Sequence, residues 1–135
     1  MSIENKKENG TEEIKRGQET LLEAEGLANL CLYNGAVSRL YYYLFYHVRA
    51  LLLTKGIEPK THEGVERMFS QHFVKTNIFV HNNSKFLSRL AKYRGDADYN
   101  PSIVFTKEDF DEFITIAKAF TLKIRKYLKA KKYIK

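Results

Sequence analysis

The chain has 135 residues with 23 basic and 16 acidic side chains, one cysteine and a formal net charge of +7. This length fits a single domain, which buries enough surface to fold without disulfide bonds or a structural metal. One cysteine excludes a disulfide scaffold, and the longest apolar runs are far too short to span a membrane. We therefore expect a cytoplasmic protein with no membrane association.

The charge is distributed unevenly along the chain. Residues 1–25 carry seven acidic and four basic side chains, a net charge of −3, so the remaining residues carry +10. The basic charge of residues 26–135 favours an acidic partner such as nucleic acid. We expect a flexible N-terminus over residues 1–10, one helical domain over residues 11–130 and a basic tail over residues 131–135.

Apolar residues recur at steps of three and four, which is the period of amphipathic helices. The first helix is predicted at residues 11–32, with acidic side chains in its first turn and a stop signal at Asn34-Gly35. The second is predicted at residues 36–54 and ends at Gly56, in a left-handed conformation ahead of Pro59.

Three more helices complete the prediction. Thr61 caps a helix at residues 62–76, and a fourth helix runs from residues 82–84 to Tyr93. The segment GDADYNPSIVF, residues 95–105, has the composition of a loop. Thr106 and Asp109 form a capping box that opens the last helix. The predicted fold is all-α, an antiparallel up-and-down bundle of four to five helices.

The stretch SRLYYYLFYH, residues 38–47, lies in the second predicted helix. This helix is apolar nearly all round, so we expect it at the centre of the bundle. One face carries Leu40, Leu44, Val48 and Leu51, and the opposite face carries Arg39, Tyr42, Tyr46 and Arg49. The second face is either part of the core, with its arginines paired to acids of the first helix, or a polar pocket or subunit interface.

A longer segment, AVSRLYYYLFYHVRALLLTKGIEPKTHEGVERMFSQHFVK, is followed by LSRLAKYRGDADY and a long last helix. Together they resemble the HEPN domain (higher-eukaryote and prokaryote nucleotide-binding domain), over about residues 11–128. The resemblance implies a helical bundle that dimerises so that motifs near the late loop of two subunits meet. Many members are metal-independent ribonucleases that act as toxins, paired with a minimal nucleotidyltransferase. Others bind nucleotides or partner proteins without catalysis.

Catalytic HEPN members carry an arginine followed, after four to six residues, by a histidine. The resemblance implies that the arginine holds the scissile phosphate while the histidine helps to move the proton of the ribose 2′-hydroxyl. In this chain Arg94 occupies the arginine position, but Tyr99 stands where the histidine is expected, with Asp98 beside it. Tyr99 is either a proton donor or a target of the partner nucleotidyltransferase. Alternatively, Arg94 and Asp98 form an ion pair that organises the loop.

His62 is the strongest candidate among the histidines, because Lys-Thr-His-Glu matches the family at a helix start that we expect to face Arg39 and Arg94. The ordinary alternative is a first-turn residue bonded to the backbone. A literal arginine–histidine match at residues 67 and 72 lies within a predicted helix, where five residues turn by about 140°, so we do not assign it. The predicted catalytic residues are Arg94, Asp98, Tyr99 and His62, and the predicted substrate-binding residues are Arg39, Tyr42, Tyr46 and Arg49.

The sequence has no cysteine–histidine cluster and no glycine-rich phosphate loop, so we predict neither a metal site nor a cofactor. The basic C-terminal run either contacts RNA phosphates or is a solvated helix end that complements the helix dipole. The expected partners are a second copy of the chain, a minimal nucleotidyltransferase, and RNA or a nucleotide. The alternative function is a non-catalytic module that binds nucleotides or proteins.

Overall fold

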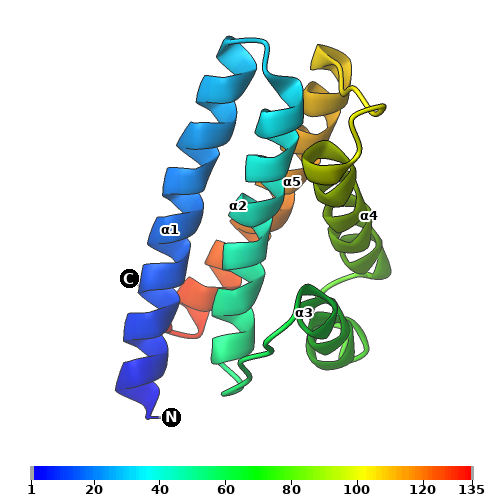
Figure 1. Ribbon diagram of the computed structural model, residues 1–135. Helices are drawn as coiled ribbons and strands as arrows, with labels where there is room; N and C mark the ends of the chain where they lie inside the picture. Colours follow the sequence, from blue (N-terminus) through cyan, green and yellow to red (C-terminus); the bar gives the residue numbers. More distant parts are fainter. Residues whose placement is uncertain (1, 135) are drawn as a thin grey trace.

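A computed structural model describes residues 2–134, which form a bundle of helices around α2 (Figure 1). The helices are α1 (Ile3–Asn29), α2 (Tyr33–Leu53), α3 (His62–Phe69), α4 (His81–Tyr99) and α5 (Lys107–Ala130), and a π-helical turn, η1 (Ser70–Val74), extends α3. The long helices run alternately up and down, with α1 on one side of α2, α4 on the other and α5 behind (Figure 1). The predicted all-α, up-and-down bundle is confirmed.

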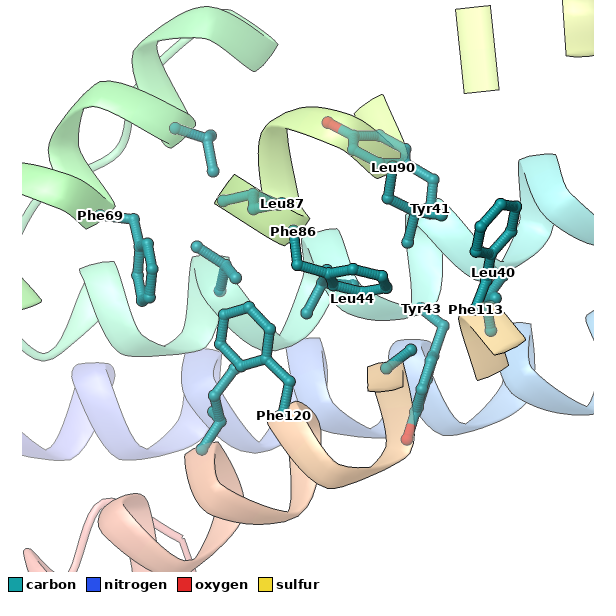
Figure 2. Packing of buried hydrophobic residues seen from close by; sticks show 14 of the residues in the cluster. Leu40, Tyr41, Tyr43, Leu44, Phe69, Phe86, Leu87, Leu90, Phe113 and Phe120 are labelled. Atoms are coloured by element: carbon teal, nitrogen blue, oxygen red, sulfur yellow. The ribbon is translucent and has the colours of Figure 1, made fainter. Parts of the chain in front are cut away.

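Helix α2 supplies the centre of the core. Its predicted apolar face is fully buried, and Tyr41 and Tyr43 on the neighbouring positions are buried as well. Figure 2 shows this helix against phenylalanines and leucines of α4 and α5, among them Phe86, Leu90 and Phe113. Because a buried leucine or phenylalanine side chain contributes roughly 1.5–3 kcal/mol, α2 is the element on which the other helices depend.

Several predicted helix boundaries are confirmed by their capping contacts. Gly56 has a φ of 70°, which is the left-handed conformation expected after α2. The Thr61 side chain accepts a hydrogen bond from the Gly64 backbone at the start of α3. Thr106 and Asp109 cap each other's backbone at the start of α5. The two threonine caps were readable because each depends on residues three positions apart, and Gly56 was readable because glycine is the residue that favours a left-handed conformation.

The predicted start of the first helix near Thr11 is wrong. Helix α1 begins at Ile3, because the Ser2 side chain caps it by accepting a hydrogen bond from the Asn5 backbone at 3.1 Å. Residues 3–10, which we expected to belong to a flexible N-terminus, are helical, and Gly10 is buried. Met1 and Lys135, the outer ends of the predicted N-terminal segment and basic tail, lie outside the described residues.

The turn between the first two helices is not at Asn34-Gly35. The chain turns at residues 30–32, where Cys31 has a φ of 59°, and Asn34 lies in the first turn of α2. Its amide nitrogen donates to the Ile103 carbonyl at 2.9 Å, and its amide oxygen accepts from the Phe105 backbone at 2.8 Å. Asn34 therefore holds the connection between α4 and α5 rather than ending α1.

The predicted loop over residues 95–105 begins too early, because α4 continues to Tyr99. A single glycine such as Gly95 lowers helix stability by about 1 kcal/mol, which does not end a helix that packs against α2. The helix stops after Tyr99 because the next residue, Asn100, precedes Pro101, and a residue before a proline disfavours the helical conformation. No helix among residues 2–134 is long and apolar enough to span a membrane.

Candidate functional site

Arg94 on α4 lies against three tyrosine rings. Its Cζ atom is 5.5 Å from the ring centre of Tyr41, 5.9 Å from that of Tyr42 and 6.0 Å from that of Tyr99. Guanidinium groups at such distances are attracted by the negative ring face. The side chain is only 15% exposed, so the position of its charge is well defined.

Arg94 retains donor capacity despite its neighbour Asp98. The two side chains form an ion pair with 3.8 Å between Nη1 and Oδ2, which is longer than a hydrogen bond. The Nε atom of Arg94 is buried and has no hydrogen-bond partner among the described residues. Because a guanidinium offers five N–H donors, an anion that approaches Arg94 competes with Asp98 rather than with a saturated network.

His62, the first residue of α3, contacts two of these rings, those of Tyr41 and Tyr42. Its Nδ1 atom lies 2.7 Å from the Tyr41 hydroxyl, and its ring centre lies 4.8 Å from that of Phe45 and 6.0 Å from that of Tyr42. Burial and, second, the positive charge of Arg94 lower the pKa of His62. The imidazole is therefore neutral at pH 7, which is the state a general base requires.

Arg39 approaches the same cluster from α2. Its Cζ atom is 4.8 Å from the Tyr42 ring centre, and its Nη1 atom is 4.0 Å from a carboxylate oxygen of Glu23 on α1. The Tyr42 ring thus contacts Arg39, Arg94 and His62. We call Arg39, Tyr42, His62, Arg94, Asp98 and Tyr99 the Arg94 site.

Two predicted substrate-binding residues lie beside this site rather than in it. Arg49 pairs with Glu13 of α1 at 3.3 Å and contacts the Phe45 ring at 5.8 Å. The Tyr46 hydroxyl lies beside Arg16 of α1 and raises the pKa of that guanidinium, and the Tyr46 ring centre is 6.4 Å from that of Tyr42. The pairing of Arg39 and Arg49 with acids of the first helix agrees with the structural interpretation of this face.

Sequence reasoning missed Tyr41 and Phe45 as members of the cluster. A helical wheel places both on the flank of α2, between the apolar and the polar face, and gives no reason to prefer them. The structure shows that His62 arrives on this flank. The i, i+4 spacing of these two aromatic residues was the only available signal. Among residues 2–134, no group of histidine, cysteine and carboxylate side chains is arranged to hold a metal ion.

The sequence was compared with known protein families and with individual relatives. The family described as HEPN domain matches residues 12–127. The chain belongs to the HEPN domain family. The site described above is therefore carried by a HEPN fold, in which α3 and α4 bring His62 and Arg94 to the same two tyrosines of α2.

Individual relatives of this HEPN domain cover most of the chain. A Methanocaldococcus jannaschii protein named "Putative toxin MJ0142" is 39% identical over 122 residues, which are 90% of this chain and 83% of the relative. A Thermotoga maritima protein named "UPF0332 protein" is 36% identical over 114 residues, or 84% and 86% of the two chains. A second M. jannaschii protein, "Putative toxin MJ0605", is 35% identical over 116 residues, or 86% of each chain.

Proposed function

We propose that this HEPN protein is the toxin-type member of a pair with a minimal nucleotidyltransferase, and that its Arg94 site cleaves RNA without a metal, in a cleft between two copies. The observation that carries the proposal is the largely buried Arg94 guanidinium, held against Tyr41 and Tyr42 beside the neutral His62. The toxin names of two relatives support the same class of function. The reaction belongs to the cytoplasm, where we expect the protein.

The proposed reaction needs one cation, one base and one acid. Arg94 holds the scissile phosphate in place of Asp98 and stabilises the charge that develops on its oxygens. His62 accepts the 2′-hydroxyl proton at Nε2, in the tautomer whose Nδ1–H donates to the Tyr41 hydroxyl oxygen. The 2′-oxygen attacks phosphorus and the bond to the 5′-oxygen breaks. Tyr99 protonates that oxygen, which leaves a 2′,3′-cyclic phosphate and a 5′-hydroxyl.

Cleavage is tested by incubating purified protein with RNA in the presence of a chelator. Arg94→Gln is expected to reduce the rate at least 100-fold, because it removes the charge that stabilises the transition state. Arg89→Gln is the matched control, since Arg89 lies on the same helix but contacts the Tyr93 ring instead, at 5.9 Å. If the wild-type protein and Arg94→Gln leave the RNA equally intact, the proposed cleavage is wrong.

The shared cleft and the partner protein need separate tests. Light scattering that shows only monomer at micromolar concentration contradicts a site built from two copies. A reading frame for a minimal nucleotidyltransferase beside this one supports the pair. Its product, mixed with this protein and a nucleoside triphosphate, is then expected to increase the mass of the wild-type chain but not of Tyr99→Phe.

A second candidate function is a non-catalytic module that binds a nucleotidyltransferase. The exposure of Tyr99, 79%, and of Val104 in the following connection, 77%, favours it, because large exposed apolar side chains are typical of protein-binding surfaces. Under this alternative the wild-type protein forms a stable complex with the nucleotidyltransferase, and RNA stays intact in the absence of metal.

A further inference from the structure

A second group of basic side chains comes from the residues after α2 and from the second half of α5, and it packs on aromatic rings of η1, of the connection after η1 and of α5. The C-terminal ends of α2 and α5 lie at the same end of the bundle (Figure 1). Three lysines of this group each lie over an aromatic ring. The Nζ atom is 5.8 Å from the Phe73 ring centre for Lys55, 4.7 Å from the Phe79 ring centre for Lys123, and 6.0 Å from the Tyr127 ring centre for Lys131. We call these three lysines the lysine surface.

The lysine surface is continuous because its three rings touch one another. The ring centres of Phe73, Phe79 and Tyr127 are 5.9–6.2 Å apart in every pair. Phe73 and Phe79 are buried, so their positions are fixed by the core. The ammonium groups lie over one aromatic cluster, which orders the lysine stems before any ligand arrives.

The three lysines differ from other lysines of the chain in their ion pairs. Within residues 2–134 none of the three lysines forms an ion pair, whereas Lys107 and Lys118 pair with Asp111 and Glu25. The segments that supply the three lysines and their rings, residues 26–57, 67–95 and 113–135, contain no aspartate or glutamate. Lys55 comes from the first of these segments and Lys123 and Lys131 from the third, while the second supplies the rings of Phe73 and Phe79.

We propose that the lysine surface binds the phosphate backbone of single-stranded RNA, apart from the Arg94 site. Exposed ammonium groups without counter-charges create a positive potential, and each one that meets a phosphate releases a condensed cation. Lysine contacts to phosphates position a nucleic acid without reading its sequence. The choice of RNA over an acidic protein rests on the proposed function. The lysine surface would then contact parts of the RNA strand that lie beyond the nucleotides held at Arg94.

The test measures binding of a fluorescent single-stranded RNA whose riboses are 2′-O-methylated, so that no 2′-hydroxyl is available for cleavage. The triple variant Lys55→Gln, Lys123→Gln and Lys131→Gln is compared with a control of equal net charge, Lys15→Gln, Lys107→Gln and Lys118→Gln. Anisotropy titrations at several salt concentrations give the affinity and the slope of log K against log salt. Circular dichroism verifies that both variants are folded.

The lysine-surface variant is expected to bind at least tenfold more weakly than the control at low salt, with a salt slope shallower by about 2, because about 0.7 is lost per phosphate on single strands. Equal affinities and slopes for the two variants would overturn the proposal. The proposal would also be overturned if the lysine-surface variant kept its affinity for RNA but lost binding to poly-glutamate, because the surface would then bind an acidic protein. Wild-type protein that binds this RNA through the three lysines but cleaves no unmodified RNA refutes the proposed cleavage alone.

Discussion

The hydroxyl of Tyr41 on α2 lies 2.7 Å from Nδ1 of His62, the first residue of α3. Tyr41 is fully buried, and burial, followed by the charge of Glu66, raises the pKa of its hydroxyl. The phenol therefore stays protonated in neutral solution. This contact joins the short helix α3 to the centre of the core, and it fixes the imidazole beside Arg94.

Replacing Tyr41 with phenylalanine tests the structural part of this relationship. Tyr41→Phe is expected to lower the free energy of unfolding by about 1 kcal/mol, because it removes one partly buried hydrogen bond and leaves His62 Nδ1 without its partner. Urea unfolding followed by circular dichroism measures the change. Tyr46→Phe is the control, since the hydroxyl of Tyr46 lies beside the exposed Arg16 and is expected to contribute less than about 0.5 kcal/mol. Equal stabilities of the two variants would contradict the assignment.

The ion pair between Arg94 and Asp98 predicts that replacing Asp98 increases the affinity for RNA. Asp98 competes with a phosphate for the guanidinium, so Asp98→Asn is expected to raise the affinity for 2′-O-methylated RNA about threefold, as for a partly exposed ion pair. Asp96→Asn removes the same charge from the same helix and is the control. If Asp98→Asn binds no more tightly than Asp96→Asn, Asp98 does not compete. If it also cleaves more slowly, Asp98 takes part in the proton transfers.

Local signals predicted the helices and their caps, but contacts between helices decided the site. The pairing of Arg39 and Arg49 with the first helix followed from the wheel, because α2 lies beside an acidic neighbour. The role of Asn34 could not be predicted in this way, since its partners Ile103 and Phe105 are far along the chain. Likewise, the extension of α4 to Tyr99 depends on packing that outweighs the helix-breaking tendency of Gly95.

Gly17 on α1 is required by close packing against α2. A Cβ atom at this position would lie 2.8 Å from Nδ1 and 2.9 Å from Cε1 of the buried His47, and 3.3 Å from the Tyr43 carbonyl oxygen. Gly17→Ala is expected to lower the free energy of unfolding by about 2 kcal/mol, because the core must shift to accept the methyl group.

Gly26→Ala on the same helix is the control for Gly17→Ala. A Cβ atom at Gly26 meets no atom within 4 Å, so this variant is expected to be more stable than the wild type by about 0.5–1 kcal/mol, through helix propensity alone. Thermal or urea unfolding distinguishes the two positions. Stabilisation by both alanines would show that α1 does not approach α2 as closely as described.

His47 is held in its neutral form inside the core. Its Nδ1–H donates to the Tyr43 carbonyl oxygen at 2.8 Å, and its Nε2 accepts from Arg125 of α5 at 2.9 Å. Burial, together with the positive charge of Arg125, lowers the pKa of His47 to about 4, although the Tyr43 carbonyl opposes the shift. Protonation would add a charge in the core and turn the Nε2 acceptor into a donor facing a guanidinium.

The lowered pKa predicts acid sensitivity with a definite sign. An unfolded histidine titrates near pH 6.5, so the unfolded chain binds more protons than the folded chain between about pH 6.5 and 4. The contribution of His47 to the free energy of unfolding is complete above pH 6.5 and is lost as the pH falls towards 4, by up to about 3 kcal/mol.

His47→Gln is expected to be less stable than the wild type at pH 7.5 but to lose less stability between pH 7 and pH 5. The exposed His81→Gln is the control, and His62 adds a smaller dependence of the same sign in every variant. Urea unfolding over this pH range measures the slopes, and equal slopes for His47→Gln and the wild type would mean that His47 titrates normally in the folded protein.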